Sequence, residues 1–371
     1  MKIPLSGPDI TEAEIAAVVA VMRSGRLSLG AKLCEFEAGF TTYLDVPFTV
    51  GVSSGTAGLH LAMRALGIGE GDEVIVPSFT FIAAANAVAY ERATPVFVDI
   101  DPATLNLDPI AVEAAITPKT RAILAVHTFG IPADLEQLSA ISARHNLLLV
   151  EDACEAIGAE WRGRKAGTIG DAGVFGFYPN KQITTAEGGM VVTRDASLAA
   201  RIRSLRNHGR GGSGDWFEHQ ELGYNYRLSE LHAAIGVEQL KRVDAILARR
   251  EDIARGYAQR LRGCTDLTLP LLDLADGKIS WFVYVVRLAA RFSRAQRDRI
   301  IAAMAERGIA GGRYFAPIHM QEPYRGAGVR LPVAESIADR TIALPFFNAL
   351  TELEMDEVCD ALRSSLEKFR G

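Results

Sequence analysis

Lys181 stands in a sequence context that could support chemistry at its side-chain amine. It follows residues 172–178, an apolar run typical of a buried strand, and it precedes the glycine pair at positions 188 and 189. Glycine lets the backbone approach a large planar group closely, because it carries no side chain. Lysine is almost never buried without a partner, so the competing interpretation is a solvated lysine on a loop. A second feature upstream favours the reactive lysine.

Two acids, Glu151 and Asp152, end an aliphatic run at residues 147–150 that is typical of a parallel strand buried on both faces. A carboxylate at the carboxyl end of such a strand faces the ligand crevice of the sheet. Pyridoxal phosphate (PLP) needs a lysine to form its Schiff base and an acid to keep its ring nitrogen protonated. Lys181 and Asp152 can supply both groups, so we predict that they are the catalytic pair of a PLP enzyme.

The composition is that of a soluble globular protein with two or three structural units: 371 residues, 49% hydrophobic and 23% charged. The net charge of -5 gives no positive field for nucleic acid or an anionic membrane, so neither is an expected partner. No apolar run is long enough to span a bilayer and the N-terminus lacks the apolar core of a signal peptide, so the expected location is the cytoplasm. The cysteines, which lack Cys-x-x-Cys spacing and are expected to be reduced with no metal site, are Cys34, Cys154, Cys264 and Cys359.

Short apolar runs alternate with helical patterns along the first part of the chain. Strands are expected near residues 50–52, 73–77, 94–101, 122–127 and 147–152, with helices between them. This alternation predicts an α/β fold with a mainly parallel sheet, right-handed crossovers and helices on both faces. Capping boxes are expected at Thr11, Ser293 and Thr351, and the helix after Thr11 has an apolar face of Ile15, Val18, Val19 and Met22. A long helical pattern runs from residue 231 to about 261, and from about residue 245 the pattern changes to α+β, with a strand expected at 280–288. We therefore predict a large domain at residues 1–244 and a small C-terminal domain at residues 245–371.

A turn of small residues, Ser54, Gly55, Thr56 and Ala57, leads from the first expected strand into a helix. The first N–H groups of a helix and the helix dipole can hold a phosphate. A plain serine N-cap explains the same residues equally well. From the residues alone, the turn is therefore either a phosphate site or a helix cap.

Residues 146–159 and 172–190, together with this turn, resemble the DegT/StrS-like sugar aminotransferases, a family of the fold type I PLP-dependent transferases. The resemblance covers nearly the whole chain. It implies PLP as the cofactor, the fold type I architecture, and a homodimer whose two chains share their active sites. It also implies transfer of an amino group from L-glutamate to a nucleotide-linked keto sugar, through a Schiff base at Lys181, in aminosugar and polysaccharide biosynthesis.

The same resemblance assigns roles to residues around the cofactor. It implies that the turn from Ser54 to Ala57 contacts the PLP phosphate and that Phe81 stacks on the pyridine ring. It also implies that Asn225 reaches the PLP phosphate of the partner chain. Taken alone, Phe81 is typical of a core residue and Asn225 of an Asx turn. The substrate contacts expected from the resemblance are Ser28, Arg210, Tyr226, Arg227, Arg313, Tyr314 and His319.

Three features of the sequence, namely His127, the loop at residues 209–214 and Arg227, each have more than one interpretation. His127 ends an expected strand, where it either lines the cofactor face or is satisfied inside the protein. Residues 209–214 form a glycine-rich loop that could close over an acceptor, with Arg210 near its phosphates. Arg227 is equally typical of a solvated charge.

The chain departs from the common family pattern at two positions. Most members carry a serine where this chain has Gly176, which leaves the backbone amide for the phosphate. Many members carry a glutamine where Glu155 stands, and a carboxylate near the phenolic oxygen of PLP needs a proton or a positive neighbour. Residues 152–156 are similar to the pattern of perosamine synthases and related 4-aminosugar enzymes. The expected acceptor is therefore a 4-keto-6-deoxyhexose on a nucleotide.

Other functions remain as alternatives. A cyclitol ketone could replace the keto sugar, and a non-catalytic regulatory protein could share the PLP fold. The dehydratase branch of the family has a histidine in place of the lysine, so Lys181 argues against it. A nicotinamide-dependent dehydrogenase is disfavoured because no Gly-x-Gly-x-x-Gly turn follows the first strand. The sequence leaves open the nucleotide base, the sugar, the ring carbon that is aminated, and whether dimers associate further.

Overall fold

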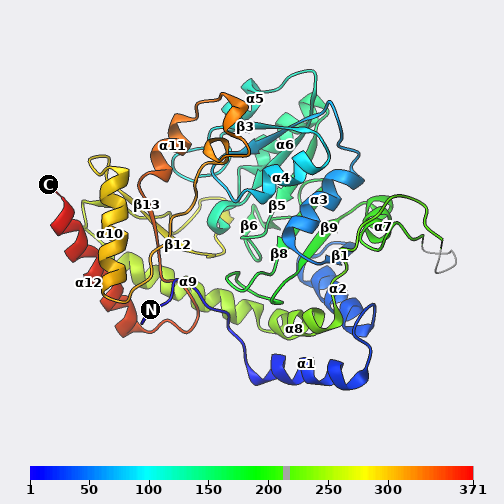
Figure 1. Ribbon diagram of the computed structural model, residues 1–371, viewed down its shortest axis with the longest axis horizontal. Coiled ribbons are helices and arrows are strands. Elements are labelled where there is room, and N and C mark those ends of the chain that lie inside the picture. The colour runs from blue at the N-terminus through cyan, green and yellow to red at the C-terminus, as the bar shows by residue number, and fades with distance from the viewer. Residues whose placement is uncertain (212–217, 371) are drawn as a thin grey trace.

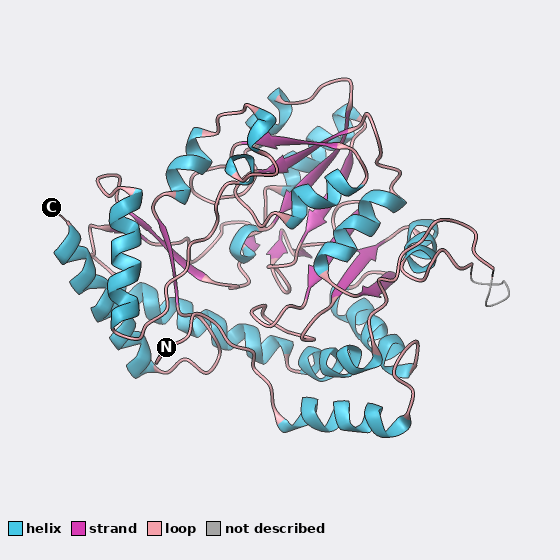
Figure 2. Ribbon diagram, in the orientation of Figure 1, coloured by secondary structure: helices cyan, strands magenta, loops and turns pink. Residues whose placement is uncertain are grey.

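The computed structural model describes residues 1–211 and 218–370, and a seven-stranded sheet forms its centre (Figures 1 and 2). The strand order is β1-β9-β8-β5-β4-β2-β3, and β9 is antiparallel to both of its neighbours while the other neighbours are parallel. The prediction of a mainly parallel α/β sheet is confirmed. The strands are β1 (Phe48–Val52), β2 (Glu73–Pro77), β3 (Thr94–Val98), β4 (Thr120–Val126), β5 (Leu148–Asp152), β8 (Ala172–Gly176) and β9 (Gly189–Thr193).

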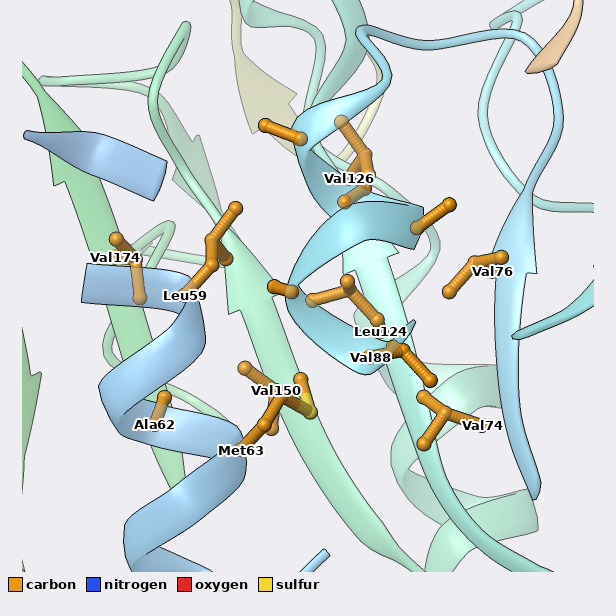
Figure 3. Packing of buried hydrophobic residues seen from close by; sticks show 14 of the residues in the cluster. Leu59, Ala62, Met63, Val74, Val76, Val88, Leu124, Val126, Val150 and Val174 are labelled. Atoms are coloured by element: carbon orange, nitrogen blue, oxygen red, sulfur yellow. The ribbon is translucent and has the colours of Figure 1, made fainter. Parts of the chain in front are cut away.

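Helices cover both faces of this sheet because alternate strand residues are apolar on both sides. Val74 and Val76 of β2 pack in the cluster beneath α3, α4 and α7, whereas Ile75 packs against α6 on the opposite face. Figure 3 shows Leu59 and Met63 of α3 directed at the strand valines. The helices are α2 (Ala31–Leu44), α3 (Gly55–Ala65), α4 (Ala83–Tyr90), α5 (Pro109–Ala114), α6 (Leu135–His145), α7 (Ala196–Leu205) and α8 (Glu230–Lys241).

Helix α1 (Glu12–Ser24) lies apart from the sheet, along α8 (Figure 1). The expected capping box of Thr11 and Glu14 is present, and Gly25 ends the helix with a left-handed φ of 71°. The apolar stripe expected on this helix is exposed: Ile15 is 49% exposed and Met22 is 62% exposed. The helix is attached instead through Glu14, whose Oε1 accepts a hydrogen bond of 2.7 Å from Gln239. Its apolar face is therefore available to another surface.

The C-terminal part is α+β, as expected. The strand expected at 280–288 begins only at Tyr284, because the carbonyls of Trp281 and Phe282 accept hydrogen bonds from Arg250 instead of a strand partner. A small separate sheet is formed by β6 (Glu160–Trp161), β7 (Arg164–Lys165) and β11 (Gly277–Lys278). The other elements are β10 (Leu267–Thr268), β12 (Tyr284–Leu288), β13 (Thr341–Leu344), α10 (Arg294–Glu306), α11 (Pro332–Ala338), α12 (Glu352–Phe369), and the 3-10 turns η1 (Thr128–Gly130), η2 (Ile318–Met320) and η3 (Arg325–Ala327).

One helix, α9 (Val243–Leu261), joins the two parts. The single helix expected from residue 231 to 261 is interrupted at Arg242, whose φ of −108° and ψ of 3° are not helical. Ile246 packs in the core of the large domain, whereas Tyr257 packs in the core of the small domain. The predicted boundary at 244 thus falls in the first turn of a helix that both cores share. Ile3 also packs in the small-domain core and pairs with Ile309, although its position placed it in the predicted large domain.

Candidate active site

A cavity of about 430 Å³ opens at the carboxyl ends of the parallel strands. Its floor and sides come from the segments that follow β1, β2, β4, β5 and β8, which is where a sheet of this kind binds ligands. A larger surface groove beside Arg194 and Arg201 contains none of the predicted site residues, so we place the site by the chemistry of its lining. The predicted residues that line the cavity are Ser54, Gly55, Thr56, Phe81, Asp152, Glu155, Gly176, Lys181 and Tyr314.

Lys181 extends into this cavity from a tight turn after β8. Its backbone N–H donates to the carbonyl of Tyr178 at 2.9 Å, and its side chain is only 16% exposed. The Nζ atom lies 3.4 Å from Oε1 of Glu155 and 4.1 Å from the centre of the Phe282 ring. A carboxylate and an aromatic face together compensate the ammonium for lost hydration. The geometry therefore matches a lysine held for chemistry rather than a solvated loop lysine.

Glu155 is the acid closest to this amine. Its second oxygen, Oε2, accepts a hydrogen bond of 2.9 Å from the backbone N–H of Phe129. Burial raises the pKa of the Glu155 carboxyl, and the Lys181 ammonium and the Phe129 N–H reduce that rise without cancelling it. The positive neighbour that this carboxylate needs is thus Lys181.

The two acids that end β5 point in opposite directions, as successive strand residues do. Asp152 lines the cavity, where its Oδ1 accepts a hydrogen bond of 3.1 Å from the N–H of Cys154. Glu151 is fully buried and accepts hydrogen bonds from the N–H groups of Gly167, Ile169 and Gly170. Only Asp152 is therefore placed for ligand chemistry.

His127 follows β4, the strand that pairs with β5, and its side chain is fully buried. Its Nε2 lies 3.0 Å from Oε2 of Glu151, and its Nδ1 accepts a hydrogen bond of 3.0 Å from the N–H of Ala133. Burial alone would raise the pKa of the Glu151 carboxyl, but the hydrogen bonds from His127 and from the backbone N–H groups outweigh burial and lower that pKa. Of the two interpretations of His127, the structure supports the one in which it is satisfied inside the protein.

The turn before α3 combines a helix cap with an open cradle. The Oγ atom of Ser54 accepts a hydrogen bond of 3.0 Å from the N–H of Ala57, so the N-cap interpretation is correct. Gly55 and Thr56, in the first turn, line the cavity beside Gly176. A Cβ atom added at Gly176 would lie 3.1 Å from Sγ of Cys154, so a side chain at this position would require Cys154 to shift by a few tenths of an ångström. The cap and an anion site are compatible here, because the helix start remains at the cavity surface.

Several predicted substrate contacts lie outside the cavity of their own chain. Ser28 and Asn225 are exposed, and Arg227 donates a hydrogen bond of 3.0 Å to Oδ1 of Asn207. The hydroxyl of Tyr226 lies 3.2 Å from Nδ1 of His60. Arg210 donates a longer hydrogen bond, of 3.3 Å, to the same Asn207 oxygen. Residues 212–217, which include the end of the predicted glycine-rich loop, lie outside the described residues.

Arg313 and His319 are also placed elsewhere. Arg313 is largely exposed and lies 3.1 Å from Oδ1 of Asp298. His319 is buried between Oγ of Ser78, at 2.6 Å, and Oε1 of Glu335, at 3.2 Å. Both ring nitrogens are engaged, so the geometry gives His319 a role in holding its loop in place of the predicted substrate contact.

Several lining residues were not predicted from the sequence. Among them, Phe282 and Phe315 come from the C-terminal part of the chain, and Thr80 follows β2. Phe315 stacks on Phe129 with ring centres 5.3 Å apart, and Tyr314 stacks on Phe315 at 5.2 Å. No local pattern marks Phe282 and Phe315, because their place in the site depends on how the C-terminal part packs against the central sheet.

Comparisons with known proteins decide the family. Residues 8–363 match the DegT/DnrJ/EryC1/StrS aminotransferase family. The chain belongs to this family. It is 44% identical over 338 residues to a GDP-perosamine synthase of Caulobacter vibrioides, with 90% of each chain covered. Its fold is similar to that of the aminotransferase TlmJ from Streptoalloteichus hindustanus, with a TM-score of 0.94, 36% identity and full coverage of both chains. The fold is also similar to that of the sugar aminotransferase Spr1654 from Streptococcus pneumoniae in its PLP-form, with a TM-score of 0.94, 31% identity and full coverage of both chains.

The protein is thus a PLP-dependent aminotransferase, and its cavity has the groups that this cofactor requires. Lys181 would supply the amine, Asp152 would supply a carboxylate for the ring nitrogen, and the start of α3 would supply N–H groups for the phosphate. Within the described residues, no group of three or more His, Cys, Asp or Glu side chains is arranged to hold a metal ion. Among the described residues of the aminotransferase, no helix is long and apolar enough to cross a membrane.

The first prediction concerns how the ionisation of Glu155 makes the stability of the aminotransferase depend on pH. A carboxyl whose pKa is higher in the folded than in the unfolded protein contributes most to stability below its unfolded pKa, near 4.5, and this contribution is lost as pH rises through the folded pKa. The free energy of unfolding of the wild type, relative to that of Glu155→Gln, is therefore expected to fall as pH rises above 4.5. Urea unfolding of both cofactor-free proteins across this range measures it. A difference that stays constant, or grows with pH, would contradict the buried carboxylate.

The second prediction concerns the cradle beside α3. Gly176→Ser is expected to lower the free energy of unfolding by about 1–3 kcal/mol and to weaken PLP binding, because the new Cβ crowds Cys154. Removing the sulfur in Cys154→Ala/Gly176→Ser is expected to restore most of both losses. Urea unfolding and PLP titration measure the effects, and Cys154→Ala alone is the control. Equal stability of the single Gly176 variant and the double variant would show that Cys154 does not limit this position.

Proposed function

We propose that the aminotransferase moves the amino group of L-glutamate to a nucleotide-linked 4-keto-6-deoxyhexose. What supports this acceptor is the wall that the small domain adds to the cavity. That wall consists of Phe282, Tyr314 and Phe315, and no arginine lines the cavity within the described part of the chain. Enzymes for small dicarboxylates usually bind the far carboxylate with a bidentate arginine. The aromatic wall suits a bulky ring that carries hydroxyl groups, and the 44% identity to a GDP-perosamine synthase supports the same class.

Several residues that line the cavity each have their own role in the proposed reaction. PLP, when bound, supplies an electron sink for the carbon that loses its proton. The Nζ atom of Lys181 holds the cofactor and then moves the proton at the reacting carbon. The carboxylate of Asp152 holds the proton of the ring nitrogen, and Glu155 balances the charge of Lys181. Tyr314 and Phe315 cover the small-domain side and exclude water.

We further propose that two chains form a homodimer with shared sites. Phe81, which lines the cavity, is 61% exposed, and Tyr178 beside it is 54% exposed. The apolar face of α1 borders a groove of about 350 Å³ that continues to Pro179 and Ala186, on either side of Lys181. Apolar surface of this extent usually marks an interface. A second copy of the chain would cover this apolar surface and bring the exposed Asn225 to the neighbouring cavity.

The cytoplasmic location of the protein stays a prediction from the sequence.

A substrate panel tests the acceptor. Purified enzyme with L-glutamate is expected to aminate a GDP-linked 4-keto-6-deoxyhexose with a kcat/KM far above that for pyruvate or oxaloacetate, because the aromatic wall of the cavity can pack against a sugar ring but not against a short keto acid. UDP- and dTDP-linked sugars in the same panel identify the base, and Lys181→Ala is the blank. Equal rates with the small keto acids would overturn the acceptor class. A cyclitol ketone that outperforms every keto sugar would move the protein to that class, and no turnover with any acceptor would favour a regulatory role.

A further inference from the structure

Arg250 is a buried arginine in the middle of α9, the helix that both cores share. It is 2% exposed, and none of the ion pairs among the described residues includes it. Burial lowers the pKa of its guanidinium to about 10, and the charge of Asp9 opposes this shift slightly. A buried cation without an acid is costly unless its donors are satisfied, so its partners indicate what it is kept for.

Those partners lie mainly in one short segment before β12. The Nε atom of Arg250 donates to the carbonyl of Trp281 at 2.7 Å, and one terminal nitrogen donates to the carbonyl of Phe282 at 2.7 Å. The other terminal nitrogen donates to Oδ1 of Asn348 at 3.0 Å. The planar fork of arginine thus fixes two successive peptide groups, which a lysine could not do with one ammonium.

The same segment is fixed from the other side by the residue after the reactive lysine. Nε2 of Gln182 donates to the carbonyl of Ser280 at 3.1 Å and to the carbonyl of Glu155 at 2.5 Å. Residues 280–282 are therefore held between Arg250 of the shared helix and the loop that carries Lys181. These hydrogen bonds together fix the position of Phe282, whose ring centre lies 4.1 Å from Nζ of Lys181.

We propose that Arg250 is a positioning residue for the amine of Lys181, acting through the backbone of Trp281 and Phe282, an inference that rests on the proposed role of Lys181. Arg250 fixes the backbone carbonyl groups of Trp281 and Phe282, and this fixes the Phe282 ring. The ring in turn covers one side of the Lys181 ammonium. Glu155 contacts the same ammonium, with its Oε1 at 3.4 Å from Nζ. The amine is thereby kept at one place between a ring and a carboxylate, with its orientation set by a residue that does not touch the cavity.

The test compares Arg250→Gln with a matched control, Arg249→Gln. Arg249 also binds carbonyl groups of the small domain, those of Asn348 and Leu350, but it makes no contact with residues 281 and 282. In the full-length chain freed of cofactor, the rate at which acetic anhydride labels Lys181, relative to the exposed Lys119, is measured by peptide mass spectrometry. A loosened Phe282 leaves the amine open, so the relative rate is expected to rise severalfold in Arg250→Gln and to stay at the wild-type value in Arg249→Gln.

The holoenzyme gives a second readout. A misplaced amine is expected to lower kcat by about tenfold to a hundredfold with KM for glutamate nearly unchanged, and Arg250→Lys is expected to recover part of the loss. Phe282→Leu should reproduce the labelling change, and the double variant should add nothing further. If Arg250→Gln does not fold, Arg250→Lys and Phe282→Leu carry the test alone. Unchanged labelling in Arg250→Gln or Phe282→Leu would overturn the role of Arg250, whereas a label rate for Lys181 that matches Lys119 in the wild type would instead count against Lys181 itself.

Discussion

Lys181→Ala is expected to lose all transamination while remaining folded and able to bind PLP. No other lysine lines the cavity among the described residues, so no second amine can take over the proton at the reacting carbon. The turn at Ser54 and the carboxylate of Asp152 remain, and they still hold the phosphate and the ring nitrogen. Turnover with glutamate, circular dichroism and PLP titration measure the three properties separately.

Borohydride reduction of the wild-type enzyme locates the amine directly. The PLP label is expected on the peptide that contains Lys181. Lys165 offers a useful comparison, because its Nζ lies 3.8 Å from the centre of the Tyr43 ring and so also sits against an aromatic face, but it does not line the cavity. Recovery of the label on Lys165 or on any other lysine would place the chemistry elsewhere.

Mixing two inactive proteins, Lys181→Ala and Asn225→Ala, is expected to restore activity. If Asn225 serves the cavity of the partner chain, a hybrid dimer contains one site with both changes and one site with neither. The restored activity should approach one intact site per hybrid dimer. Activity is measured after the two proteins have been denatured, mixed and refolded together.

A mixture of Lys181→Ala with Asp152→Asn is the matched control for this experiment. Lys181 and Asp152 line the cavity of the same chain, so no hybrid of these two variants contains an intact site. This control is expected to stay inactive. Restoration in the control as well, or failure of the Asn225 mixture despite proven subunit exchange, would assign Asn225 to its own chain or to no site.

The parts of the structure that depend on neighbours in sequence were predictable. Lys181 and Asp152 could be found because strand ends are visible as apolar runs and parallel strands end at one edge of a sheet. The capping boxes at Thr11, Ser293 and Thr351 were predictable for the same reason, since a cap is decided within four residues.

The parts that depend on distant contacts were not predictable. Arg250 and Phe282 have no local signal, because one is a charge in a helical pattern and the other an aromatic residue in an apparent strand. Their roles arise when the small domain folds back on the large one. His319 shows the reverse case: its position suggested a substrate contact, but the distant Ser78 and Glu335 engage both of its ring nitrogens.

Synthesis from the N-terminus separates Ile3 in time from everything that it packs against. Its backbone N–H donates to the carbonyl of Gly308, and its side chain lies among residues such as Tyr257 and Tyr284. The large domain can assemble while these partners are still untranslated, because domains generally fold as units in the order of synthesis. Ile3 can then be buried only after these distant partners have emerged from the ribosome. A residue that is made early is thus buried late, in a core that it shares with residues far along the chain.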